Sequence, residues 1–150
     1  MQTLLQTRDH PSYDDDLALW IDAQIHLLLD HRFSELDVDN LVAELHGMKK
    51  RETRALKNRL RVLIMHLLKC QFQPEHPQNK WRATLIEQRA RLAQLLDDSP
   101  SMRPALPEYV YESYDVAVRM AVAETGLPPG AFPAANPYSI EQILDQDFMP

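Results

Sequence analysis

Apolar residues recur every three or four positions along most of the chain, which is the spacing of amphipathic α-helices. The first stripe runs from Leu17 to Leu28 and follows Asp14–Asp16, whose carboxylates can cap a helix that begins there. The longest stripe runs from Leu41 to Leu67 and predicts one helix over about 39–71. Gly47 is the position at which this helix could bend or break, because glycine destabilises a helix interior by about 1 kcal/mol.

Prolines and glycine predict where the following helices begin and end. Pro74 and Pro77 stop the long helix, since proline cannot continue it. A third apolar stripe predicts a helix over about 79–96. Pro107 suits the first turn of a fourth helix, and Gly126 suits a left-handed terminating position after it.

The two ends of the chain carry weaker patterns. We expect residues 1–12 to form a flexible leader and residues 127–150 to form a proline-rich tail. Ser139 and Gln142 match a capping box for a last short helix over 140–144. No linker or repeat divides the chain, so we expect residues 1–150 to form a single all-α domain, a bundle of about five helices with a long central second helix.

Composition narrows the class of protein. Hydrophobic residues make up 45% and charged residues 25% of the 150 residues, which are globular proportions. Cys70 is the only cysteine, so an intrachain disulfide is excluded. Acidic residues interrupt the N-terminal segment, and no apolar run approaches the ~18 residues of a membrane span. We therefore expect a cytoplasmic protein that has no membrane partner.

Charge is unevenly distributed. Residues 49–91 hold twelve basic and three acidic residues, whereas the chain as a whole has a formal charge of −6. This basic segment could neutralise the phosphates of a nucleic acid. It could equally pair with the acidic first and fourth helices, either inside the bundle or between subunits. The acidic pI of about 5.4 favours internal or interfacial pairing.

Two spacings are compatible with metal ligation, although neither makes a complete site. His66 and Cys70 are four residues apart and share one helix face. Asp22, His26 and Asp30 recur at the same interval along the first predicted helix. Packing and local ion pairs explain both patterns equally well, so we expect no metal and no other cofactor.

Acid–base catalysis is also weakly supported. Glu44 and His66 could act together, but 22 residues of straight helix span about 33 Å. They would meet only if the chain turned at Gly47, or across a dimer interface. The chain contains neither the G-x-S-x-G nor the H-E-x-x-H pattern of hydrolases.

Several local motifs together resemble one family. The motifs are Tyr13-Asp14-x-Asp16, Asn40-Leu41-x-x-Glu44, His66-Leu67-Leu68-Lys69, Gln71-x-Gln73-Pro74, Trp81-Arg82-x-Thr84, Leu95-Leu96-x-Asp98-Ser99-Pro100 and Thr125-Gly126-Leu127-Pro128. The chain resembles the domain of unknown function family 29 from Tyr13 to Pro150. The resemblance implies an all-α fold and a bacterial cytoplasmic protein, and it implies no activity.

A polar set around the predicted 74–79 turn distinguishes the chain from a generic helical bundle. Its members are His66, Gln73, Trp81, Arg82, Glu87, Gln88 and Arg89. They could form a recognition surface, because Trp and Arg often dominate interface energetics, or a network that fixes the helix crossing. The leading hypothesis is a non-enzymatic interaction or regulatory module that binds itself or another protein. The alternatives are a nucleic-acid-binding protein that uses residues 49–91, and a metal-dependent enzyme that uses His66.

Overall fold

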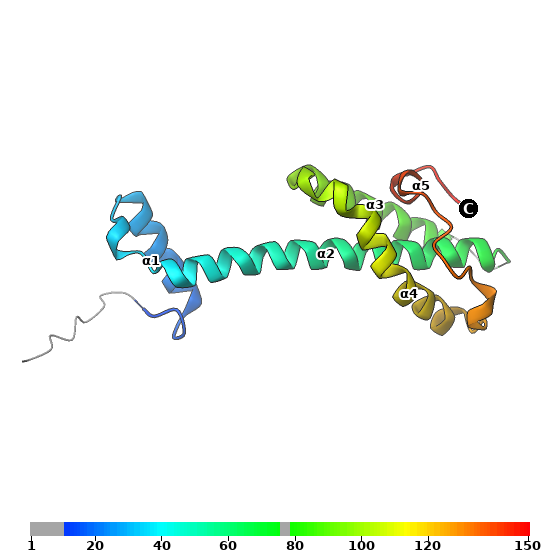
Figure 1. Ribbon diagram of the computed structural model, residues 1–150, viewed down its shortest axis with the longest axis horizontal. Helices are drawn as coiled ribbons and strands as arrows, with labels where there is room; N and C mark the ends of the chain where they lie inside the picture. The colour runs from blue at the N-terminus through cyan, green and yellow to red at the C-terminus, as the bar shows by residue number, and fades with distance from the viewer. Residues whose placement is uncertain (1–10, 76–78) are drawn as a thin grey trace, which may run out of the picture. The chain divides into compact units, whose positions relative to one another are not determined.

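The computed structural model describes residues 11–75 and 79–150, and these residues contain helices and no strand. The α-helices are α1 (Leu17–Leu29), α2 (Val38–Phe72), α3 (Asn79–Asp98), α4 (Leu106–Thr125) and α5 (Ile140–Leu144) (Figure 1). The 3-10 turns are η1 (Phe33–Glu35), η2 (Pro100–Ala105) and η3 (Pro129–Ala131). The all-α class, the five helices and the long second helix are therefore confirmed. None of the described helices is both long and apolar enough to cross a membrane.

The chain divides into two compact units, and the boundary falls between Lys49 and Lys50 within α2. α2 is helical through Gly47, so the bend that glycine made conceivable is not a break in the helix. Residues 11–49 form what we call the N-terminal hairpin, and residues 50–150 form the C-terminal bundle. The predicted single domain stays a prediction. All but two residues of the predicted 1–12 leader lie outside the described residues.

In the N-terminal hairpin, both ends of α1 are fixed by local hydrogen bonds. The carboxylate of Asp16 accepts from the backbone N–H of Leu19 at 3.0 Å, which caps the first turn. His31 adopts a left-handed conformation (φ 57) directly after the helix. The N–H of Arg32 donates to the carbonyl of Leu27 at 2.9 Å, which is the bond expected when a left-handed residue ends a helix. The chain then reverses through η1.

Asp37 connects the two helices of the hairpin. Its backbone N–H donates to Oε1 of buried Gln24 at 2.8 Å, and its carboxylate accepts from Nε1 of buried Trp20 at 3.1 Å. Near the other end of the hairpin, the Tyr13 hydroxyl donates to Glu44 at 2.6 Å. These pairs, at rising positions in α1 and falling positions in α2, show that α1 and the start of α2 are antiparallel.

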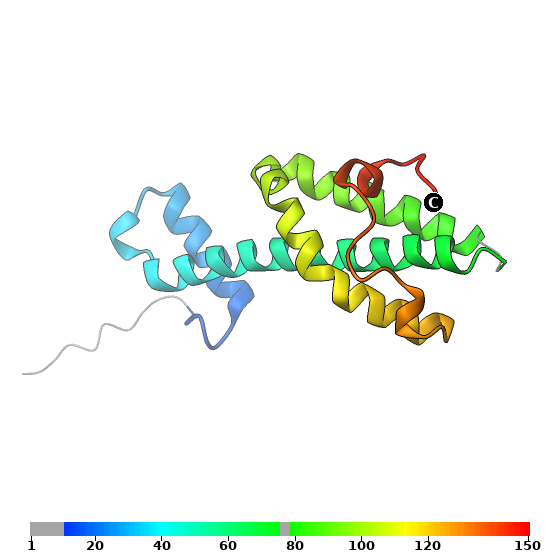
Figure 2. The same cartoon turned by 45° about the vertical axis from the view of Figure 1, so that its right-hand side comes forward.

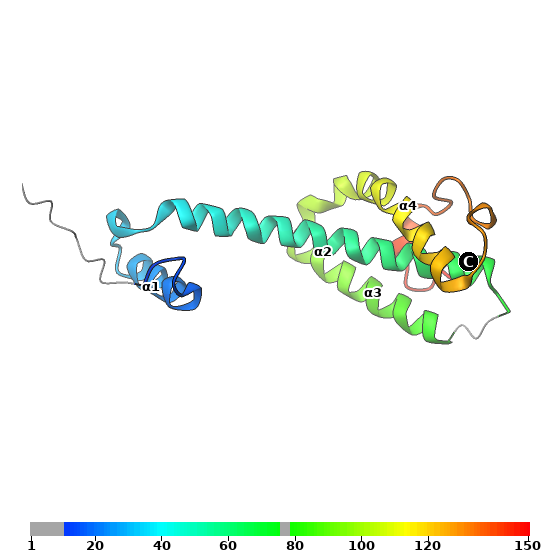
Figure 3. The same ribbon diagram turned by 90° about the horizontal axis from the view of Figure 1, so that it is seen from below.

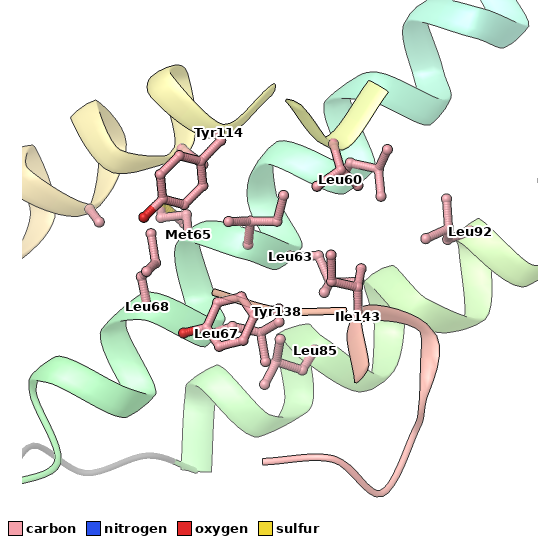
Figure 4. Packing of buried hydrophobic residues seen from close by; sticks show 14 of the residues in the cluster. Leu60, Leu63, Met65, Leu67, Leu68, Leu85, Leu92, Tyr114, Tyr138 and Ile143 are labelled. Carbon is pink, nitrogen blue, oxygen red and sulfur yellow. The ribbon is translucent and has the colours of Figure 1, made fainter. Parts of the chain in front are cut away.

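In the C-terminal bundle, α3 and α4 pack against the second half of α2 (Figures 2 and 3). The core is largely aliphatic, and α2 contributes eight consecutive buried residues from Leu63 to Cys70. Figure 4 shows residues of α2, α3, α4 and the C-terminal segment meeting in this core, among them Leu63, Leu85, Tyr114 and Ile143. A helix that is buried on several sides suits a central position in the bundle.

The C-terminal segment follows the caps that the sequence predicts. Gly126 ends α4 in the left-handed region (φ 71). Ser139 and Gln142 form a complete capping box at the start of α5. Tyr138 is buried, and its hydroxyl donates to Oε1 of Gln71 in α2 at 2.8 Å. The tail is therefore an integral part of the bundle, with its predicted short helix confirmed.

Candidate functional site

The predicted polar set does not lie on one surface. Arg89 is 2% exposed, and its guanidinium donates to the carbonyls of Ile143, Phe148 and Gln142 at 2.9, 2.9 and 3.0 Å. Its charge is satisfied by the last carbonyls of α5 and by the tail that follows. Burial lowers the pKa of Arg89, yet guanidinium stays protonated at any physiological pH. The contacts of Arg89 are those of a residue that docks the C-terminal segment.

His66 and Trp81 lie around the ammonium group of Lys69. Lys69 is 7% exposed, forms an ion pair with Glu124 of α4, and places its Nζ 4.7 Å from the centroid of the Trp81 ring. His66 precedes Lys69 by almost one turn of α2 and is also buried. We call these four residues the Lys69 cluster. It joins α2, α3 and α4 through one buried cation.

His66 is held neutral in this cluster. Burial, followed by the positive charge of Lys69, lowers its pKa to about 4. Its Nδ1 atom is buried, and no hydrogen-bond partner for it lies in the part of the chain that the structure describes. Burial also raises the pKa of the neighbouring Cys70 thiol. A neutral imidazole beside a protonated thiol is not an activated nucleophile pair.

The remaining members of the polar set are nearer the surface. Gln88 is half-buried, and its Oε1 accepts from Arg59 at 3.2 Å, which ties α3 to α2. Glu87 is exposed and pairs with Arg91 one turn later at 2.8 Å. Gln73 is half-buried, and Arg82 is exposed. A binding role for any of these side chains remains a prediction.

The basic segment is partly neutralised inside the chain. Lys57 of α2 pairs with Glu112 of α4 at 2.5 Å, and Lys69 pairs with Glu124 on the same helix. The predicted pairing of basic residues with the acidic fourth helix is therefore confirmed. Lys57 also lies 4.8 Å from the centroid of the Tyr109 ring. These contacts reduce the positive charge available to a nucleic acid along this face of α2.

The patterns considered for metals and catalysis do not assemble into sites. No group of three metal-ligating side chains occurs within residues 11–75 and 79–150. Glu44 accepts from Tyr13 in the hairpin, and α2 has no turn at Gly47 that could bring this carboxylate to His66. His26 contacts the backbone carbonyl of Asp22 at 2.7 Å, a local contact within α1.

The most unusual surface lies on the N-terminal hairpin, where large apolar side chains are exposed. Trp20, Gln24 and Leu27 are the buried residues of α1. On α1, the exposed members are Leu17, Ile21, Ile25 and Leu28, which are 40–45% exposed; on α2, they are Val38, Val42, Leu45 and Met48, which are 46–63% exposed. We call these eight residues the apolar face. Single exposed apolar residues are ordinary, whereas a contiguous set marks an interaction site.

Helical geometry places all eight residues on the same side of the hairpin. At 100° per residue, the four members on α1 fall within about 80° of one another, directly beside the buried Trp20 and Leu27. The four members on α2 span about 120°, beside half-buried Leu41 and Glu44. Viewed from the start of each helix, both stripes are displaced clockwise from the inward-facing side. Because the helices are antiparallel, this displacement turns both stripes to one side.

A signal for the apolar face was present in the sequence. The stripe on α1 is wider than the residues needed to pack against one neighbouring helix, because Ile21, Ile25 and Leu28 add to Trp20 and Leu27. Sequence reasoning assigned all of these positions to a core, since periodicity identifies an apolar side and does not identify what covers it. The exposed fractions reveal that residues of this chain leave half of the stripe uncovered.

The fold and the two candidate sites define an all-α protein that has a polar cluster inside one helical unit and an uncovered apolar face on the other. The chain belongs to the family described as domain of unknown function DUF29, whose model matches residues 12–149. The resemblance in the sequence motifs is thereby confirmed. Neither the comparison with curated proteins nor the comparison with solved structures finds a match.

Proposed function

We propose that this protein is a protein–protein interaction module that binds through the apolar face of its N-terminal hairpin. The observation that carries the proposal is the exposure of eight large apolar side chains on one side of a two-helix unit. Leaving such side chains in water is unfavourable by about 25 cal/mol for each Å² of apolar surface, and covering them would recover that free energy. We also propose the bacterial cytoplasm as its location.

The charge of the hairpin favours a protein partner over a membrane surface. Residues 11–49 contain nine acidic and two basic residues, a formal charge of −7. Helices that lie on membranes typically carry Lys and Arg on their polar side, because lipid surfaces are anionic. The acidic hairpin would be repelled by such a surface.

Affinity capture with matched variants tests the proposal. The disrupting variant is Ile21→Glu/Leu45→Glu, which places one carboxylate in each stripe at positions that are 40% and 63% exposed. The control is Tyr111→Glu, at a position on α4 that is 83% exposed. Both variants should keep the helical content and melting temperature of the wild-type protein, because the substituted side chains are largely outside the core.

The expected result is that the wild-type protein and the control associate with the same protein, while the disrupting variant loses that association. The associated protein can be a second copy, which differential tagging detects, or a different chain. Equal association by all three proteins would contradict the proposal, because the apolar face would then contribute nothing.

A further inference from the structure

The occupant of the apolar face follows from its area, its lack of charge and the charges at its two ends. We propose that a second copy of this chain covers the face, with the two hairpins packed antiparallel as a four-helix bundle. This inference rests on the proposed function, because it assigns the partner of the same surface.

The exposed area is of the size that a symmetric dimer requires. Eight residues of this size, each about half exposed, present on the order of 700 Å², close to the roughly 800 Å² per partner buried in a stable interface. In a twofold dimer the same patch serves both partners, so no second surface is needed. Two helices from each copy would enclose a core in the way that four-helix bundles do.

The size of the hairpin supports the same arrangement. The hairpin has three buried side chains in α1, of which Gln24 is polar and is used to hold Asp37. Units of about 40 residues rarely bury enough apolar surface to be stable alone, and oligomerisation is one common remedy. Pairing of two hairpins would convert the half-exposed stripes into a shared core.

Charges at the ends of the hairpin select the antiparallel orientation. Glu35, Asp37 and Asp39 lie at the loop end, where α2 begins, whereas α2 continues past Met48 with Lys49, Lys50 and Arg51. Antiparallel packing of α2 on the partner's α2 would bring this basic turn beside the acidic loop end of the other copy. The opposite orientation would set acid against acid, which is destabilising.

The same pairing is compatible with the first helix. Asp14–Asp16 precede α1, and His31 and Arg32 follow it. Antiparallel packing of α1 on the partner's α1 would bring these opposite ends together. Within the apolar face itself no position is charged, so self-pairing buries no unpaired charge there.

Sedimentation velocity on charge-swapped variants of the full chain tests both the partner and the orientation. One variant is Lys50→Glu/Arg51→Glu and the other is Glu35→Lys/Asp39→Lys; all four side chains are exposed. The wild-type protein should sediment as a dimer. Each variant alone should dimerise at least about tenfold more weakly, since both of its symmetric contacts would become repulsive. An equimolar mixture should recover the wild-type affinity, because both contacts become attractive in the mixed dimer.

The failures of the inference and of the proposed function give different results. A wild-type protein that remains monomeric overturns the inference. If the Ile21→Glu/Leu45→Glu variant nevertheless loses a different protein captured by the wild type, the proposed function stands with another partner. If the wild type is monomeric and instead floats with phosphatidylcholine vesicles, a lipid surface is the occupant and both fail. A dimer that the Ile21→Glu/Leu45→Glu variant leaves intact, or a mixture of charge-swapped variants that remains monomeric, also overturns the inference.

Discussion

The guanidinium Nε of Arg89 in α3 donates to the backbone carbonyl of Ile143 in α5 at 2.9 Å, inside the C-terminal bundle. The same side chain also reaches the carbonyls of Gln142 and Phe148. The last carbonyls of a helix have no partner within that helix, so a buried short helix needs donors from elsewhere. Arg89 supplies three of them, which explains how five helical residues and an extended tail remain docked.

Replacing Arg89 should therefore loosen the C-terminal segment. We expect Arg89→Met to lower the free energy of unfolding by about 3 kcal/mol, because buried carbonyls would lose charge-assisted hydrogen bonds. Hydrogen exchange should rise most in residues 138–150. Arg91→Met, at an exposed position on the same helix, should change stability by less than about 0.5 kcal/mol. Equal effects of the two substitutions in urea unfolding would contradict this role.

His66 should make the protein sensitive to mild acid. Its pKa of about 4 in the folded state lies below the 6.5 of an unfolded chain, so the unfolded state binds the extra proton first. The stability that its neutral form contributes is complete above pH 6.5 and falls as the pH drops towards 4. Between pH 7 and pH 5, wild-type protein should lose about 2 kcal/mol more than His66→Gln.

Urea unfolding at the two pH values measures this difference directly. The substitution keeps a polar side chain at the site and removes only the titration. The same loss in both proteins between pH 7 and pH 5 would show that His66 is not the group that titrates.

The ion pair of Lys69 with Glu124 should respond asymmetrically to substitution. Lys69 is 7% exposed, whereas the Glu124 side chain is 48% exposed, so solvent screens one partner more than the other. We expect Glu124→Gln to cost about 1 kcal/mol, because it leaves a buried ammonium without its carboxylate. The double variant Lys69→Met/Glu124→Gln should be more stable than the single Glu124→Gln variant.

Thermal unfolding of the single and double variants distinguishes this account from simple additivity. If the double variant is less stable than Glu124→Gln, the buried charge is not what the carboxylate compensates. Trp81 would then be the main partner of Lys69, through the ring face that lies 4.7 Å away.

Gly126 offers a test of backbone conformation that is free of packing. Its φ of 71 lies in the left-handed region, and a side-chain Cβ would meet nothing within 4 Å. Gly126→Ala should thus cost about 1 kcal/mol from conformation alone. Gly130→Ala is the matched control, because Gly130 has the same open surroundings without the left-handed φ, and it should be neutral or slightly stabilising. Comparable losses at both positions would contradict the argument.

The sequence predicted the helices and their caps well, because those features depend on neighbouring residues. The Ser139–Gln142 capping box and the Gly126 terminator are local patterns, and both are present as expected. The continuity of α2 through Gly47 was the favoured prediction, although glycine propensity alone opposes it.

The contacts of the polar set could not be predicted, because they depend on which helices meet. Arg89 reads as a surface residue in sequence, yet its partners are 53 to 59 positions away. The apolar face was hidden for a related reason, since Ile21 and Leu45 belong to stripes that look like core positions. Periodicity identifies the apolar side of a helix, and only the fold shows that the chain leaves it uncovered.

The measurement that tests the central claim most directly is hydrogen exchange of the full chain at low and high protein concentration. If two hairpins pair through the apolar face, amides of α1 and of residues 38–48 should be protected more strongly at high concentration, because association opposes local opening. Amides of α3 should be unaffected by concentration. Hairpin exchange that does not change with concentration, or a change confined to the C-terminal bundle, would contradict the account.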